Sequence, residues 1–203
     1  IERYDISNSL VLKFFLKRIL SQATKPFSVN RIWNDLRSMG YRIGNNTLYE
    51  YADHIQASFA SLMINRFDYS GIRQALSEKK AYAIDNGILT AVDWSFSENH
   101  GKLLENLVAL EHLKSGKDVM YFSDTRECDF IIMEKLSYSA IQVCYSLKES
   151  DTYERETGGL VNACRYLKLK SGTILTYEEE SEIKKDDIII EVLPAYKYFL
   201  ERL

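Results

Sequence analysis

Asp129 is the residue whose type and setting most suggest chemistry, because it is the one acidic residue within the apolar run CDFIIM (128–133). A second β-rich run, YSAIQVCYS (138–146), follows after a polar stretch, so the two runs predict an antiparallel hairpin. Side chains alternate along a strand, which places Gln142 and Cys144 on one face of the second arm. The hairpin would thus bring a carboxylate toward an amide and a thiol.

An acid on one hairpin arm, facing a polar residue, one spacer and a third group on the other arm, resembles the PD-(D/E)xK nuclease fold. In that family the second arm reads Glu-x-Lys, whereas here it reads Gln142-Val143-Cys144. The two carboxylates of the family motif hold magnesium, and the lysine supports the attacking water. Gln142 offers only a neutral carbonyl oxygen, and the Cys144 thiol supplies no cation and is a poor magnesium ligand.

A further carboxylate, Glu105, lies on the predicted helix before the hairpin and matches the helix carboxylate that many members of that family add. With Asp129 it would form a weak site for Mg²⁺ or Mn²⁺. Two interpretations stay open. We favour a nuclease-like fold retained without its chemistry over an active, divergent nuclease that uses Asp129 and Glu105 with Gln142 as a neutral ligand.

The elements that must position these residues follow from hydrophobic spacing and turn signals. We expect, in order, a helix through 103–113 with Gly116 past its end, strand 119–122, the hairpin, a helix capped by Asp151 or Thr152, strands 173–177 and 188–194, and a final helix at 195–203. The polar run at 178–187 reads as a solvated loop or hairpin tip. The order helix, three strands, helix, strand is the core order of the restriction-endonuclease-like fold, with an added strand and helix.

Two features of the helix after the hairpin bear on the same site. Gly158 and Gly159 in its middle indicate close packing against the sheet or a kink. The charged triplet 154–156 (Glu-Arg-Glu) either borders the cleft or forms an exposed face of mixed charge.

Residues 1–95 predict a different module, a winged helix-turn-helix with a connector. Three helices are expected, the first capped within 7–9, the second starting at Ser28 and stopping at Gly40, and the third capped by Asn45 or Asn46. Two β-like runs at 61–67 and 79–86, joined by a polar loop, would form the wing.

Nucleic acid is one predicted partner of this module. The residues expected to contact it are Arg42, Asn45, Asn46, Arg66, Arg73, Lys79 and Lys80. Acidic Glu50 and Asp53 on the expected reading helix would repel phosphates, so packing of the module on another protein domain is the open alternative.

Composition sets the wider bounds. The 203 residues suit an α/β (α+β) protein of two domains, 1–95 and 96–203, with 12 Lys and Arg against 9 Asp and Glu in the first and 14 against 20 in the second. Three cysteines without CxxC spacing argue against disulfides and zinc. With no long apolar stretch and no signal peptide, we expect no membrane partner and a cytoplasmic location.

A further resemblance rests on five stretches of the chain: KKAYAIDNGIL, GKLLENLVALEHL, ECDFII, IQVCYSL and GTILTYEEE. With these stretches, the chain as a whole resembles the C-terminal region of AAA-type ATPase-like proteins that carry a domain of unknown function called DUF4143. It implies an N-terminal P-loop ATPase domain on the intact protein. This sequence contains no GxxxxGK[ST] motif, so we expect no ATP site in it. Three functions remain open: a nucleic-acid-interacting or targeting region with a degenerate nuclease-like domain, an active divergent nuclease, or a protein-interaction platform without a nucleic-acid role.

Overall fold

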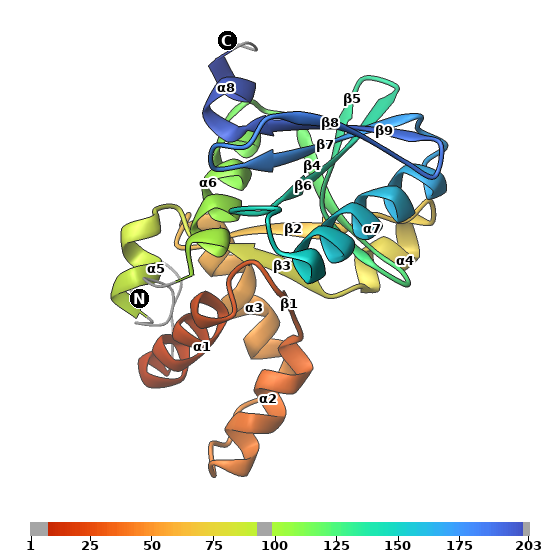
Figure 1. Ribbon diagram of the computed structural model, residues 1–203. Coiled ribbons are helices and arrows are strands. Elements are labelled where there is room, and N and C mark those ends of the chain that lie inside the picture. The colour runs from red at the N-terminus through yellow and green to blue at the C-terminus, as the bar shows by residue number, and fades with distance from the viewer. Residues whose placement is uncertain (1–7, 93–98, 201–203) are drawn as a thin grey trace. The chain divides into compact units, whose positions relative to one another are not determined.

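The chain divides into two compact units in the computed structural model, which describes residues 8–92 and 99–200 (Figure 1). The first unit comprises residues 1–63 and 78–98, and the second comprises 64–77 and 99–203. The single predicted boundary near residue 95 does not account for residues 64–77, which lie in the second unit. Residues 64–77 belong with the second unit, because Asn65 and Arg66 pair in parallel with strand β4 (Asp118–Ser123) and Phe67 is buried in the second unit's core.

Over its described residues, the first unit contains the three predicted helices, together with one short helix and two strands that pair in antiparallel fashion. Its elements are α1 (Ser9–Ser21), β1 (Pro26–Phe27), α2 (Val29–Ser38), α3 (Asn45–Ala57), β3 (Lys79–Tyr82) and α5 (Asn86–Val92). Apolar side chains from α1, α2 and α3 meet in one buried cluster that includes Phe15, Leu36 and Leu48. This amphipathic spacing is what predicted the helices. Trp94 and Phe96, expected to continue the connector, lie outside the described residues.

Helix starts in this unit follow the predicted capping chemistry at two of three places. The side chain of Asn8 accepts a hydrogen bond from the backbone N–H of Val11, and that of Ser28 from Arg31. The third prediction was wrong. Gly44 is the N-cap of α3 without a side-chain hydrogen bond, and Asn45 is already the first helical residue.

The two predicted wing strands are neighbours in the sheet, but the loop between them and their further pairings differ from expectation. The stretch between the two β-like runs contains a helix, α4 (Gly71–Leu76), which Ser70 caps by accepting from the backbone N–H of Arg73. Strand β2 (Leu62–Arg66) lies beside β3, and each has a second partner outside the wing. Strand β2 pairs in parallel with β4, and β3 pairs antiparallel with β1. Sequence spacing fixes where a strand forms, but not which strand lies beside it.

The second unit is built on a mixed sheet in the order β2-β4-β5-β6-β7-β9-β8. Its further elements are α6 (His100–Lys114), β4 (Asp118–Ser123), β5 (Glu127–Glu134), β6 (Ser137–Val143), α7 (Ser150–Tyr166), β7 (Ser171–Thr176), β8 (Ser181–Lys185), β9 (Ile188–Pro194) and α8 (Ala195–Leu200). Strands β4, β5 and β6 are antiparallel neighbours, whereas β6, β7 and β9 are parallel. The predicted hairpin is thus confirmed as β5 and β6.

The run 178–187 was predicted to be a solvated loop or a hairpin tip, and the second alternative is the closer one. Strand β8, which was not predicted, occupies the middle of this run. It pairs antiparallel with β9 at the edge of the sheet, and Asp186 and Asp187, with φ of 51° and 63°, form the tip between the two strands. Charged residues are usual on an edge strand, so its composition resembles that of a loop.

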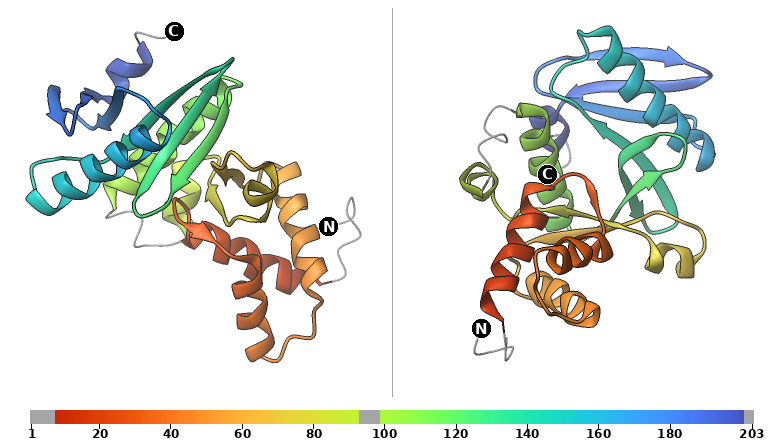
Figure 2. Two further views of the ribbon diagram at one scale, coloured as in Figure 1. Left: turned by 90° about the vertical axis from the view of Figure 1, so that its right-hand side faces the viewer. Right: turned by 90° about the horizontal axis from the view of Figure 1, so that it is seen from below.

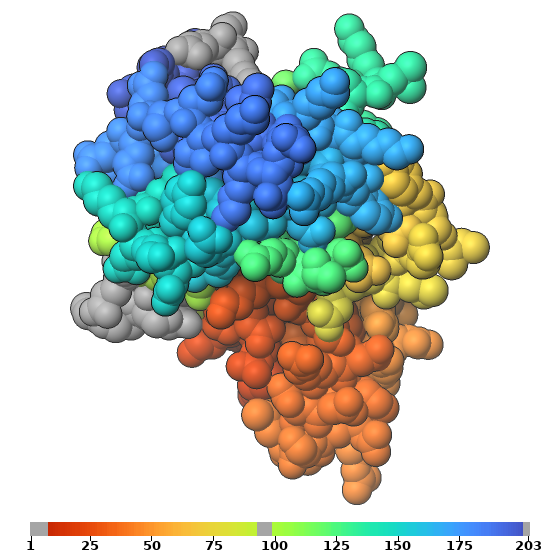
Figure 3. Space-filling view, turned by 45° about the vertical axis from the view of Figure 1, so that its right-hand side comes forward, coloured from red at the N-terminus to blue at the C-terminus, as the bar shows by residue number. Residues whose placement is uncertain are grey.

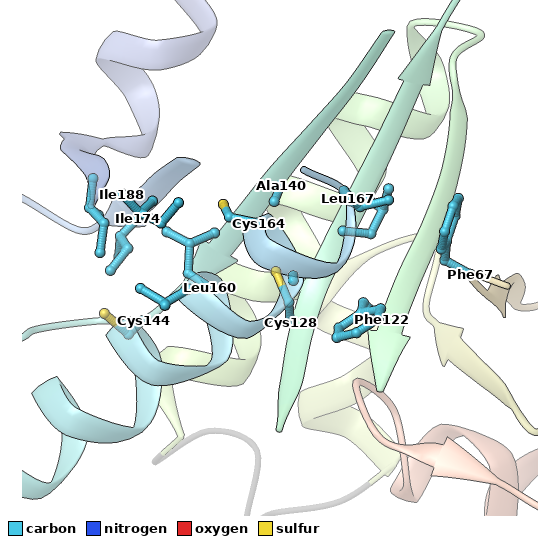
Figure 4. Close-up of a cluster of buried hydrophobic side chains, with 14 of the residues drawn as sticks. Phe67, Phe122, Cys128, Ala140, Cys144, Leu160, Cys164, Leu167, Ile174 and Ile188 are labelled. Carbon is cyan, nitrogen blue, oxygen red and sulfur yellow. The ribbon is translucent and has the colours of Figure 1, made fainter. Parts of the chain in front are cut away.

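Helices α6 and α7 cover opposite faces of this sheet (Figures 1 and 2). Phe130 of β5 contacts His112 of α6, whereas its neighbour Ile131 belongs to the cluster that includes Leu160 of α7. Figure 4 shows that apolar cluster between α7 and the strands. Leu136, at the tip of the β5–β6 hairpin, is fully exposed, and the tip projects from the surface at the upper right of Figure 3.

Among the described residues, no helix combines the length and apolarity that a membrane crossing requires.

Candidate functional site

Asp129 and Gln142 lie just beyond the end of the β5–β6 backbone pairing, where their side chains accept the hydrogen bonds between the two strands. The register between β5 and β6 ends at Phe130 and Ile141. Beyond it, the backbone N–H of Asp129 donates to Gln142 Oε1 at 3.1 Å, and the backbone N–H of Val143 donates to Asp129 Oδ2 at 3.0 Å. Each side chain therefore satisfies a backbone donor on the opposite strand, as buried polar groups require.

Helix α7 adds a third polar residue, Glu156, to this pair. Gln142 Nε2 donates to Glu156 Oε2 at 2.5 Å, and the Arg155 guanidinium donates twice to Glu156 Oε1, at 2.9 and 2.6 Å. Glu156 is only 6% exposed, and burial raises the pKa of its carboxyl, with the nearby Asp129 carboxylate acting in the same direction. Hydrogen bonds from Arg155 and Gln142 partly oppose that rise.

These residues line a cleft of about 650 Å³ at the open end of the hairpin. The predicted site residues Glu105, Asp129 and Gln142 all lie on its wall, and the charged triplet 154–156 borders it. Six carboxylates and two arginines face the cleft: Glu105, Glu127, Asp129, Asp151, Glu154 and Glu156, with Arg126 and Arg155. The excess of negative charge attracts cations and repels phosphates.

Cys144 shares the α7 face with Gln142, as strand alternation predicted, but it does not line the cleft. It is 5% exposed and belongs to the apolar cluster with Leu160 and Cys164 (Figure 4). Burial, followed by the nearby carboxylates of Glu156, Glu179 and Asp129, raises the pKa of its thiol to about 12. A protonated thiol in an apolar setting supplies neither a cation nor a nucleophile.

The arrangement does not fit a magnesium site as the residues stand. Within residues 8–92 and 99–200, no group of three or more Asp, Glu, His or Cys side chains is placed to hold a metal ion. The carbonyl oxygen of Gln142, considered as a neutral ligand, accepts the Asp129 N–H, and Asp129 Oδ2 accepts from Val143. A magnesium ion would have to compete with both bonds for ligands that already have partners.

Close packing of α7 on β5 depends on the two glycines in the middle of the helix. A Cβ on Gly159 would lie 2.1 Å from the carbonyl oxygen of Glu127, and one on Gly158 would lie 2.0 Å from Nη1 of Arg126. Arg126 in turn donates to the backbone carbonyl of Glu154 at 2.9 Å. The predicted close packing is confirmed, and it sets the width of the cleft.

Sequence reasoning missed three residues of the cleft wall: Arg126, Glu127 and Asp151. Glu127 lies two residues before Asp129 on the same strand, so strand alternation contained the signal for it. Asp151 lies three residues before Glu154 on α7, a spacing that places both on one helix face. Arg126 precedes the strand, and no sequence pattern indicated its direction.

The residues predicted to contact nucleic acid are distributed over both units. Arg42 and Asn46 are exposed in the first unit, Asn45 and Lys79 are half-buried, and Lys80 is fully buried and so cannot meet a phosphate there.

The other two residues of that set, Arg66 and Arg73, belong to the second unit beside Asp68. Arg73 Nη2 contacts Asp68 Oδ1 at 2.9 Å. With Arg66 and Arg73 in the second unit, the first contains 10 Lys and Arg against 9 Asp and Glu, so its excess of positive charge is nearly lost.

The fold is a mixed α/β arrangement. Comparison with known proteins finds two relatives of similar sequence. No protein-family model matches the chain. An uncharacterized protein of Methanocaldococcus jannaschii is 30% identical over 211 residues, which cover 98% of this chain and 46% of the relative. An uncharacterized protein of Haemophilus influenzae is 24% identical over 194 residues, which cover 94% of this chain and 47% of the relative. The chain thus spans about half the length of these curated relatives.

Among solved structures, the chain is similar to a chain in an assembly of Thermococcus gammatolerans McrB AAA+ hexamers with bound McrC. The identity is 9% and the TM-score 0.36, with 90% of this chain and 70% of the other covered.

Proposed function

We propose that this chain is a non-catalytic targeting region of a larger, AAA-type ATPase-like protein. It would join a winged-helix module in the first unit to a restriction-endonuclease-like second unit that has lost its metal chemistry. The helix and strand order of the two units supports this assignment, as does the chain's coverage of about half of each relative. The remaining half of such a protein leaves room for the ATPase domain that the sequence resemblance implies.

One observation supports the proposed loss of metal-dependent nuclease chemistry. Gln142 stands where the nuclease motif has a carboxylate, and its amide is used to connect Asp129 with Glu156. The amide donates to one carboxylate and accepts from the backbone of the other residue, which a second carboxylate could not do. The hydrogen-bonded group of Asp129, Gln142 and Glu156 therefore stabilises the packing of α7 on β5 and β6.

Protein contacts suit this region better than nucleic acid. The cleft holds six carboxylates, the second unit contains 16 Lys and Arg against 20 Asp and Glu, and the first unit is nearly neutral. Nucleic-acid binding depends on neutralising phosphates with Lys and Arg, so these surfaces offer little affinity for it. We infer that the ATPase domain of the intact protein is the first partner to test.

The decisive experiment is a titration of Mg²⁺ and Mn²⁺ into the wild-type chain and three variants, followed by calorimetry and by the melting temperature. Asp129→Asn removes a carboxylate charge while keeping the side-chain shape. Gln142→Glu restores the motif carboxylate beside Glu156 and Asp129. Gln56→Glu, on the exposed surface of α3, is the matched control for an added charge.

We expect no specific metal binding by the wild type at millimolar concentration. Gln142→Glu should bind Mn²⁺ and recover melting temperature with it, because the metal offsets repulsion among the three carboxylates. Gln56→Glu should do neither. Saturable binding by the wild type that Asp129→Asn abolishes would overturn the proposal and support a divergent nuclease. Absence of binding by Gln142→Glu would overturn the role assigned to Gln142.

A further inference from the structure

A second pocket, of about 360 Å³, lies in the second unit at the opposite end of the β5–β6 hairpin from the cleft. Met133 and Tyr138, which pair near the hairpin tip, form part of its wall, whereas Asp129 and Gln142 lie beyond the other end of the ladder. We call it the aromatic pocket and define it by Phe67, Tyr69 and Tyr138, with Asp68 and Asp118 at its wall.

In the aromatic pocket, the ring of Phe67 stands almost at right angles to the rings of Tyr69 and Tyr138. The ring of Phe67 lies 5.2 Å from that of Tyr69 with planes at 79°, and 5.2 Å from that of Tyr138 with planes at 78°. Tyr69 is 62% exposed, and its ring is supported by stacking on Tyr166 at 5.5 Å and 20°. Perpendicular rings present faces in different directions, so a group in the corner between them can meet more than one π-system.

The charges of the aromatic pocket favour a cation. Among the residues that the structure describes, its wall contains two carboxylates and no Lys or Arg. Asp68 already accepts from the backbone N–H of Ser70, which lowers the pKa of its carboxyl, and it is paired with Arg73. Asp118, exposed at the start of β4, has no ion-pair partner within the part of the chain that the structure describes. The carboxylate of Asp118 therefore remains for an incoming ligand.

We propose that the aromatic pocket binds an arginine side chain of a partner protein. A guanidinium is planar, stacks on aromatic faces and pairs with a carboxylate through two parallel hydrogen bonds, so it uses both kinds of group that this wall supplies. Lysine, a compact and strongly hydrated charge, uses them less well. The inference rests on the proposed function only in taking the occupant to be a protein.

The test uses the full chain, labelled with ¹⁵N, and two peptides that differ in one group. Acetyl-Gly-Arg-Gly-amide carries the guanidinium, and its citrulline counterpart is neutral and nearly isosteric. We expect the arginine peptide to cause saturable chemical-shift changes at the backbone amides of Asp118, Met120 and Tyr138. Its affinity should be at least tenfold higher than that of the citrulline peptide. Equal affinity, or no saturable shift at these amides, would overturn the proposal. Tighter binding of choline than of the arginine peptide would overturn it in favour of a small quaternary ammonium ligand.

Two variants and two controls complete the test. Asp118→Asn and Tyr69→Leu should each weaken binding of the arginine peptide at least tenfold. Asp187→Asn, at the exposed β8–β9 turn, and Tyr177→Leu, at a tyrosine that is 54% exposed, should leave it unchanged. Retained affinity in both pocket variants would contradict the assignment. The peptide shifts report on the pocket alone, so their failure is distinguishable from a failure of the metal prediction.

Discussion

The carbonyl oxygen of Glu127 lies 2.1 Å from the point where a Cβ on Gly159 would stand. Helix α7 therefore approaches the backbone of β5 as closely as a glycine allows. The contact fixes the distance between Glu156 on the helix and the Asp129–Gln142 pair on the strands.

Gly159→Ala should lower the free energy of unfolding by about 1–3 kcal/mol, because the added methyl group would clash with the backbone carbonyl of Glu127, which is held in β5. Urea unfolding followed by circular dichroism measures this. Gly101→Ala is the matched control, since the nearest atom to its Cβ is 3.7 Å away. The control should change stability by no more than about 1 kcal/mol, in the favourable direction, because alanine is the better helix former. Equal effects in the two variants would contradict the packing role of Gly159.

The buried carboxyl of Glu156 should make stability depend on pH. Its pKa is raised in the folded state, so the folded protein binds more protons than the unfolded chain, and stability falls as pH rises from the unfolded pKa through the folded one. Glu156→Gln lacks that titration. The stability of the variant relative to wild type should therefore increase from pH 4 upward and then level off. A difference that does not change with pH would contradict the raised pKa.

The three cysteines should resist alkylation in the folded protein. All are buried, and burial raises the pKa of Cys144 and of Cys164 to about 12. At pH 8 a thiol with such a pKa is ionised to the extent of about 10⁻⁴, and the thiolate is the form that reacts. After treatment with iodoacetamide, mass spectrometry should find no alkylated cysteine in the native protein. Over the same time, the protein unfolded in urea should be alkylated completely. Rapid alkylation of native Cys144 would show that its thiol reaches the cleft.

Affinity for DNA should be weak even at low salt. With Arg66 and Arg73 outside the first unit and Lys80 buried, few of the predicted cationic contacts remain in that unit for phosphates. Fluorescence anisotropy of labelled duplex at about 50 mM salt should show no saturation at micromolar protein, since low salt exaggerates any attraction. Saturable binding that weakens steeply with salt and is lost in Arg42→Ala would instead support a nucleic-acid role for the first unit.

Local sequence signals predicted most elements of this fold. Asn8 and Ser28 cap helices because each side chain accepts a hydrogen bond from the backbone N–H three residues later, in the first turn. Gly40 and Gly116, with φ of 87° and 72°, end helices where other residues would be strained. Such signals act over a few residues, so a single sequence contains them in full. Strand β8 escaped prediction because its stability comes from β9 rather than from its own charged residues.

By itself, the sequence determined that Asp129, Gln142 and Glu105 belong to one region, because strand alternation and element order are local and repetitive. Only the tertiary structure decided what these residues do there. Glu156 meets Gln142 because Gly159 lets α7 approach β5, and residues 64–77 leave the first unit because Asn65 and Arg66 pair with β4. Such contacts join residues far apart in the chain, and their geometry depends on how whole elements pack, which no local pattern encodes.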